Sequence, residues 1–127
     1  MSKKTLLAID DDELILRLLV NLGNDAGYEV VAVQDAQLLN DTLARLSPDL
    51  IILDLVMPKL DGIEVLNTLA DKGVTARLVL ISGFEATLLA RAGELATSLG
   101  LNLVGSVQKP LDAEKLSLVL KQIEVLG

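Results

Sequence analysis

The sequence predicts an α/β fold in which five strands of a doubly wound parallel sheet alternate with five helices. The first observation is that its most apolar segments, Leu50–Leu53 and Ala76–Ile81, carry no regular alternation of polar and apolar residues. Such runs are typical of strands that helices cover on both faces. The second is that a segment with helical spacing follows each apolar run. Right-handed crossovers are therefore expected throughout.

The first half of the chain predicts two strand and helix units. Thr5–Ile9 is a short apolar run that meets a group of acids, and the helix after it ends at Gly27. Glu29–Val33 is the second strand, and Asp35 is expected to cap the helix that follows. The apolar face of this second helix carries Leu39, Leu43 and Leu46.

The central strand leads into a third helix with clear start and stop signals. Asp61 is followed by Glu64 three residues later, which is a capping pattern. Leu60 and Val65 have the spacing of a hydrophobic staple, and Gly73 is expected to end the helix.

The last two units complete the pattern. The fourth helix ends near Gly100, and Leu103–Val107 is the fifth strand. Asp112 is expected to cap the last helix, with Leu111 and Leu116 as its staple. Its buried face is predicted to carry Leu116, Val119, Leu120 and Ile123.

The composition excludes several kinds of chemistry. The 127 residues suit one domain, residues 1–127, and we expect no output domain in this chain. There is no cysteine and no histidine. Disulfides, thiolate nucleophiles, zinc sites built on Cys or His, and Ser-His-Asp triads are therefore excluded. Carboxylates, hydroxyls and lysines remain available.

The charge balance argues against direct nucleic-acid binding. Eleven Lys and Arg against 18 Asp and Glu give a net charge of -7, and the basic residues are scattered. The only aromatic residues are Tyr28 and Phe84, so a base-stacking platform is not expected. The first apolar run is too short for a signal peptide or a membrane span. We therefore expect a cytoplasmic protein with no membrane partner.

Polar residues follow the predicted strands at the points where the strands end. Because the carboxyl ends of parallel strands meet in one crevice, these residues are expected to form one site. They are Asp10 and Asp11 after the first strand, Asp54 after the third, Ser82 after the fourth and Lys109 after the fifth.

Three acids at one edge call for a cation. Two carboxylates about 4 Å apart repel by roughly 4 kcal/mol at an effective dielectric constant near 20. Oxygen ligands without nitrogen or sulfur indicate magnesium or manganese. A carboxylate nucleophile, a metal, a lysine and a hydroxyl together are the groups that phosphoryl transfer to an aspartate requires.

Four motifs occur in order over essentially the whole chain: "LLAIDDDE", "PDLIILDLVMPKLDG", "LVLISG" and "VQKPL". Together they resemble the motifs of two-component response-regulator receiver domains, of the same type as the single-domain chemotaxis regulator. The resemblance implies a flavodoxin-like sheet with strand order 2-1-3-4-5. It also implies a phosphorelay signalling protein that catalyses only its own phosphoryl transfer and dephosphorylation, and is otherwise not an enzyme.

The resemblance also assigns roles to individual residues. Asp54 would be the phosphoacceptor, with Ser82 and Lys109 contacting the phosphoryl group. Asp10, Asp11, Asp54 and the Val56 backbone carbonyl would hold Mg²⁺, and the bond between Lys109 and Pro110 would be cis. The implied partners are a histidine kinase or phosphotransfer protein and a downstream effector. A homodimer would form through the fourth helix, fifth strand and fifth helix.

Plainer and competing interpretations exist. Asp10 to Glu13 alone suits an acidic helix start, and Lys109 alone suits a solvated side chain. An aspartyl phosphatase would need a second acid at position 56, which is Val56. A flavin-binding module would need a phosphate loop where this chain has three aspartates. A degenerate receiver that only binds proteins, without phosphorylation, is the main alternative.

The sequence departs from the family pattern at one position, and one stretch carries a second, weaker resemblance. Ser106 stands where the family commonly has a switch aromatic, three residues before Lys109. We hypothesise that Phe84 and Val56 exclude water and lengthen the life of the aspartyl phosphate. The stretch "LATSLGLNLVGSVQKPL" is similar to receivers fused to EAL-type cyclic-di-GMP phosphodiesterases, which would make such a domain the output.

Overall fold

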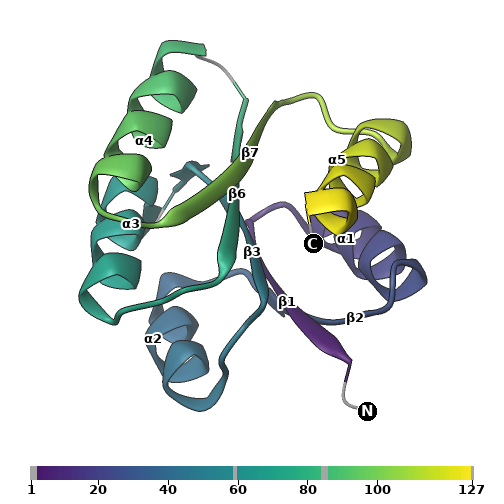
Figure 1. Ribbon diagram of the computed structural model, residues 1–127, viewed down its shortest axis with the longest axis horizontal. Coiled ribbons are helices and arrows are strands. Elements are labelled where there is room, and N and C mark those ends of the chain that lie inside the picture. Colours follow the sequence, from purple (N-terminus) through teal and green to yellow (C-terminus); the bar gives the residue numbers. More distant parts are fainter. Residues whose placement is uncertain (1–2, 59, 84–85, 127) are drawn as a thin grey trace.

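The computed structural model describes residues 3–58, 60–83 and 86–126, and its centre is a sheet of five parallel strands (Figure 1). The strand order is β2-β1-β3-β6-β7, and every neighbouring pair is parallel. Counted along the chain, this is the predicted order 2-1-3-4-5, which is confirmed. The strands are β1 (Lys4–Ile9), β2 (Tyr28–Val33), β3 (Leu50–Asp54), β6 (Arg77–Ser82) and β7 (Asn102–Gln108).

Five helices cover the two faces of the sheet, and the predicted α/β class is confirmed (Figure 1). Leu16 and Leu19 of α1 share one core cluster with Leu116 of α5. Leu39 of α2 shares the other with α3 and α4 residues. The helices are α1 (Glu13–Asp25), α2 (Ala36–Arg45), α3 (Gly62–Asp71), α4 (Ala86–Ser98) and α5 (Ala113–Leu126).

Burial follows the position of each strand in the sheet. All five residues of the central strand β3 are no more than 1% exposed. The edge strands β2 and β7 mix buried or half-buried residues with exposed ones. Because only central strands are covered on both faces and paired on both edges, the apolar runs in the sequence identified the middle of the sheet.

Glycines and aspartates set the helix ends, as predicted. Three helices end two residues before a glycine with positive φ: Gly27 (94°), Gly73 (67°) and Gly100 (80°). Asp61 accepts a hydrogen bond from the Ile63 N–H at 2.9 Å, and Asp112 accepts one from the Lys115 N–H at 2.8 Å. Both are the expected caps.

One element was not predicted. Val56–Met57 (β4) pairs antiparallel with Leu60–Asp61 (β5), directly after the central strand. Two-residue strands carry too little periodicity for a sequence pattern to reveal them. The side chain of Leu60 lies outside the described part, so the staple with Val65 stays a prediction. In the described ranges no helix is both long enough and apolar enough to cross a membrane.

Candidate functional site

The five predicted polar residues lie at the carboxyl end of the sheet. Asp54 and Ser82 are the last residues of β3 and β6, and Asp10 and Lys109 directly follow β1 and β7. These four strands are neighbours in the order β1-β3-β6-β7, so their ends form one edge. Carboxylate oxygens of Asp10, Asp11 and Asp54 all lie within 4.8 Å of one another.

Lys109 lies beside the two buried acids of the site. Its Nζ donates a hydrogen bond to Asp54 Oδ2 at 3.1 Å and lies 3.6 Å from Asp10 Oδ2. The Lys109 side chain is 24% exposed, whereas those of Asp10 and Asp54 are 1% exposed. The sequence predicted a crevice at this edge of the sheet; in the structure its two innermost acids, Asp10 and Asp54, are buried and Lys109 lies beside both. This pairing stabilises the fold, because removing one partner of a buried ion pair lowers the free energy of unfolding by on the order of 3 to 5 kcal/mol.

The backbone of the flanking loops holds the carboxylates in place. Asp10 Oδ1 accepts a hydrogen bond from the Asp12 N–H at 2.9 Å. Asp54 Oδ1 accepts one from the Val56 N–H at 3.1 Å. Asp12 itself caps α1 by accepting from the Leu14 N–H at 2.9 Å. The plainer interpretation of an acidic helix start therefore applies to Asp12, and Asp10 belongs to the site.

Two buried polar atoms of the site are available to a ligand. Asp10 Oδ2 and Ser82 Oγ are buried and have no hydrogen-bond partner among the described residues. Ser82 is 0% exposed. Its backbone carbonyl accepts a hydrogen bond from the Lys109 N–H at 2.8 Å, whereas its hydroxyl has no such partner among the described residues. Buried polar atoms are nearly always paired in folded proteins, so an orphaned acceptor and an orphaned hydroxyl suit a bound ion or substrate group.

The pKa values of Asp10 and Lys109 are both raised, for different reasons. Burial is the largest effect on Asp10 and raises its pKa from 3.8 to about 6, with a smaller increase from the Asp54 charge. The Asp12 N–H and the Lys109 charge act in the opposite direction. Burial lowers the pKa of Lys109, but its hydrogen bond to Asp54 and the two carboxylate charges outweigh burial and raise the pKa overall. Lys109 therefore stays charged.

The donor set fits a hard divalent cation. Three carboxylates supply only oxygen ligands, and the orphaned Asp10 Oδ2 is among the buried donors. Val56 lies in β4, two residues after Asp54, and its backbone carbonyl stays a predicted ligand. A bound Mg²⁺ would offset the repulsion between the carboxylates and the charge of any phosphoryl oxygens.

Sequence reasoning missed two residues that support this site. A Cβ at Gly62 would lie 2.7 Å from the Leu55 Cα, so only glycine lets α3 approach the residue that follows Asp54. The "DG" at the end of the central motif was the available signal. Lys115 Nζ donates to the Pro110 carbonyl at 3.0 Å and ties the loop after Lys109 to α5. The peptide bond between Lys109 and Pro110 is cis, as expected.

Other residues singled out in the sequence are less central. Ser106 is exposed on β7, whereas Tyr28 and Met57 are buried in the core. Val56 is 47% exposed beside the site. Phe84 lies outside the described residues, so the water-exclusion hypothesis stays a prediction.

Sequence comparisons give the chain its relatives. The sequence profile described as "Response regulator receiver domain" matches residues 6–121. The alkaline phosphatase synthesis transcriptional regulatory protein PhoP of Bacillus subtilis is 31% identical over 125 residues, covering 97% of this chain and 49% of PhoP. A protein-glutamate methylesterase/protein-glutamine glutaminase of Myxococcus xanthus is 40% identical over 90 residues, 68% of this chain and 26% of that protein. The chain thus spans half or less of these curated relatives.

Structural comparisons agree. A response regulator from Colwellia psychrerythraea superposes with a TM-score of 0.81 at 35% identity, covering 99% of this chain and 100% of the other. The chemotaxis response regulator CheY4 of Vibrio cholerae has a TM-score of 0.79 at 22% identity over 99% of this chain and 100% of CheY4, which shows the shared fold. The relatives named above do not support an EAL-type output. Nor do they support the expectation of no nucleic-acid contact, since PhoP is named a transcriptional regulator.

Proposed function

Because this chain belongs to the response regulator receiver domains of two-component systems, we propose that it accepts a phosphoryl group on Asp54. The observation that carries the proposal is the pairing of Asp54 Oδ2 with Lys109 Nζ at 3.1 Å, beside a buried Ser82 hydroxyl that has no partner in the described ranges. A nucleophilic carboxylate paired with a cation, and a buried hydroxyl at the end of the neighbouring strand β6, thus lie at one edge of the sheet.

The donor would be a phosphohistidine on a partner kinase or phosphotransfer protein, since this chain has no histidine. An Asp54 carboxylate oxygen forms the new P–O bond while the P–N bond of the phosphohistidine breaks. The imidazole leaves with the bonding electron pair and then takes a proton from solvent. Atoms and charge balance without another reactant.

Each neighbour of Asp54 has a task in this proposal. Lys109 moves its ammonium from the Asp54 carboxylate to a phosphoryl oxygen, and Ser82 donates its hydroxyl to a second one. Asp10, Asp11, Asp54 and the Val56 carbonyl would hold Mg²⁺, which supplies positive charge against the phosphoryl oxygens. The raised pKa of Asp10, about 6, fits a carboxylate that is stabilised when a cation binds.

Phosphorylation would then change a surface. It converts the singly charged Asp54 carboxylate at the end of β3 into an acyl phosphate with about two negative charges, and it would draw Ser82 and Lys109, at the ends of β6 and β7, toward the phosphoryl oxygens. The face that would respond consists of α4, β7 and α5, where β7 is incompletely buried along its length. An effector domain or a second copy of this chain would bind that face. As a signalling domain, the chain acts on its own aspartate.

A second candidate function is a degenerate receiver that binds partners without phosphorylation. Ser106 favours it, because β7 lacks the aromatic side chain whose rotation commonly reports phosphorylation in this family, and Ser106 is exposed. A hydroxymethyl group is too small to alternate between a buried and an exposed packing position. Phosphorylation would then have to act through the loops alone.

Intact-mass analysis distinguishes the two functions. The chain is incubated with acetyl phosphate, with Mg²⁺ or with a chelator, as wild type, Asp54→Asn and the control Asp71→Asn, which changes an exposed acid at the end of α3. We expect a Mg²⁺-dependent gain of one phosphoryl group in wild type and in Asp71→Asn, and none in Asp54→Asn. No gain in folded wild type would favour the degenerate receiver.

A further inference from the structure

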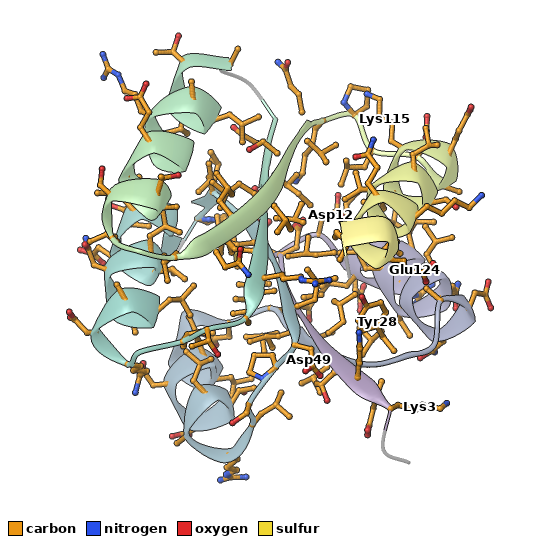
Figure 2. The ribbon with its side chains drawn as sticks, viewed as in Figure 1. Lys3, Asp12, Tyr28, Asp49, Lys115 and Glu124 are labelled. Atoms are coloured by element: carbon orange, nitrogen blue, oxygen red, sulfur yellow. The ribbon has the colours of Figure 1, made fainter. Side chains whose placement is uncertain are left out.

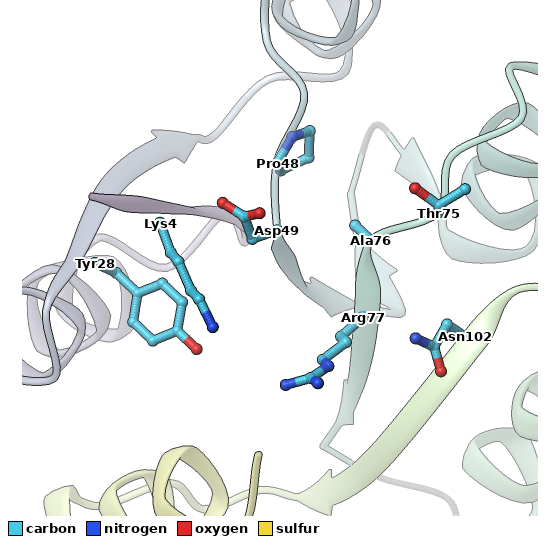
Figure 3. A pocket seen from close by; sticks show the side chains of 8 residues that line it. All are labelled: Lys4, Tyr28, Pro48, Asp49, Thr75, Ala76, Arg77 and Asn102. Atoms are coloured by element: carbon cyan, nitrogen blue, oxygen red, sulfur yellow. The ribbon is translucent and has the colours of Figure 1, made fainter. Parts of the chain in front are cut away.

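A second concave polar site lies at the opposite, amino end of the sheet. It is a cavity of about 250 Å³, and every strand of the sheet supplies a residue to it at or directly before its first position (Figure 3). The residues used below are Lys4, Tyr28, Asp49, Arg77 and Asn102. The pairing register brings them together, because Lys4 pairs with Tyr28, and Arg77 pairs with both Leu50 and Asn102.

Alternation along the strands places three of these side chains on one face. Lys4 and Tyr28 begin paired strands, and Arg77 is two residues before Val79, which packs in the α1 and α5 core cluster together with Tyr28. Figure 3 shows the side chains of Lys4, Tyr28 and Arg77 extending toward the same open space. Arg77 also donates through one guanidinium nitrogen to the Ile123 carbonyl of α5 at 3.0 Å, which holds it in position.

Neither cation of this cavity is paired with a carboxylate among the described residues. Within the described ranges, neither Lys4 nor Arg77 forms an ion pair with a carboxylate. Asp49 lines the same cavity, but its Oδ2 accepts the Thr5 N–H at 2.8 Å, and it pairs with neither cation. In a chain with a net charge of -7, two unpaired cations converging on one cavity are unusual. The plain alternative is that Arg77 only secures α5 and Lys4 is only solvated.

Neutral donors complete the cavity lining. Tyr28 is 5% exposed and carries a hydroxyl, and Asn102 offers an amide at the start of β7. Burial is the largest effect that raises the pKa of Tyr28, so its hydroxyl stays protonated and able to donate at neutral pH. Two cations and two neutral donors around a volume of this size match the oxygens of a phosphate or a small carboxylate, not an extended ligand.

We propose that this amino-end cavity binds a small anion of phosphate or carboxylate chemistry, held by Lys4 and Arg77 with Tyr28 and Asn102 as additional donors. The site is separate from the acidic one at the other end of the sheet. The carboxylates of Glu124 and Asp49, whose charges both act on the Tyr28 hydroxyl, limit its affinity by repelling the anion. Because Arg77 also holds the Ile123 carbonyl, occupancy would change the electrostatic environment at the end of α5.

The test is a titration of the ¹⁵N-labelled chain followed by amide chemical shifts at constant ionic strength, without Mg²⁺. Inorganic phosphate and succinate are the two probes, and sodium chloride is the reference salt. We expect saturable shifts for Tyr28, Arg77 and Asn102 with either or both probes, and none for Ser82 or Lys109. Which probe binds more tightly identifies the anion class.

Two matched pairs of variants sharpen this test. Lys4→Gln should weaken binding about three- to tenfold, whereas Lys3→Gln, which removes the same charge from an exposed neighbour that does not line the cavity, should leave it within about twofold. Asp49→Asn should tighten binding about two- to fivefold by removing the repelling charge, and Asp71→Asn should not.

The outcomes separate the proposal from its alternatives. Equal loss of affinity in Lys3→Gln and Lys4→Gln would mean a general ionic effect and overturn the proposal. Chemical-shift changes of the same size with sodium chloride as with the two probes would overturn it too. Shifts confined to the Ser82 and Lys109 end would assign anion binding to the acidic site instead. Because no step needs Asp54 or Mg²⁺, failure here leaves the phosphoacceptor function untouched, and the reverse also holds.

Discussion

The two ends of the same parallel sheet carry opposite arrangements of charge. At the carboxyl end, one lysine is held between two carboxylates that are 1% exposed. At the amino end, two cations from different strands line a cavity with no ion pair in the described ranges (Figure 3). Figure 2 shows the two ends, with Asp12 toward one and Tyr28 and Asp49 toward the other.

The difference lies in what each arrangement costs the fold. The carboxyl end concentrates buried charge and depends on Lys109, or on a bound cation, to offset it. The amino end keeps its charges near solvent, so leaving them unpaired costs little. Substitutions should therefore change stability strongly at the first end and ligand binding at the second.

The largest expected effect is that of Lys109→Met. Removing the ammonium leaves Asp54 and Asp10 buried without their partner. We expect the free energy of unfolding without Mg²⁺ to fall by about 2 to 4 kcal/mol at pH 7. Urea denaturation with and without Mg²⁺ measures this loss, and added Mg²⁺ should recover part of it. Lys121→Met, on the exposed side of α5, is the control. Equal losses in both variants would contradict a special role for Lys109.

Asp10→Asn should stabilise the metal-free chain. The folded-state pKa of Asp10 is raised from 3.8 to about 6, so its contribution to stability is fully present below pH 3.8 and is lost as pH rises through about 6. The gain from asparagine should thus be near zero at pH 3.5 and approach about 3 kcal/mol above pH 7. Denaturation curves across this pH range measure it. A flat profile for Asp10→Asn would refute the charge argument.

Gly62→Ala should destabilise the carboxyl end through packing alone. The added Cβ would meet the Leu55 backbone at 2.7 Å, which must shift, and we expect a loss of about 2 kcal/mol. Gly93→Ala is the matched control within α4, since its Cβ would meet only the Leu103 side chain at 3.4 Å. Alanine there should be neutral or add up to about 1 kcal/mol from helix propensity. Thermal unfolding of both variants tests the contrast.

The smallest expected effect is that of Lys115→Met, which removes the exposed hydrogen bond to the Pro110 carbonyl. We expect a stability loss of no more than about 0.5 kcal/mol. The rate of phosphorylation by acetyl phosphate should fall measurably even though stability hardly changes, because the loop that carries Lys109 is less firmly held. A rate equal to that of wild type would assign Lys115 a purely local role.

Much of this molecule follows from local sequence signals. The uninterrupted apolar run before Asp54 predicts a central strand, because only such a strand is buried on both faces. Asp61, Asp112 and the glycines at 27, 73 and 100 set helix boundaries through hydrogen bonds and backbone angles that involve near neighbours. The gathering of Asp10, Asp54 and Ser82 at one edge follows from strand direction alone.

Tertiary structure decided what depends on distant residues meeting. Lys109 lies 55 positions from Asp54, and only the sheet order and the loop conformation place its Nζ over that carboxylate. The exclusion of any larger residue at Gly62 arises from its contact with Leu55 across a turn, not from any local preference. The amino-end cavity joins first residues of strands that have no common sequence pattern. Their register, which long-range backbone pairing sets, is what makes them one site.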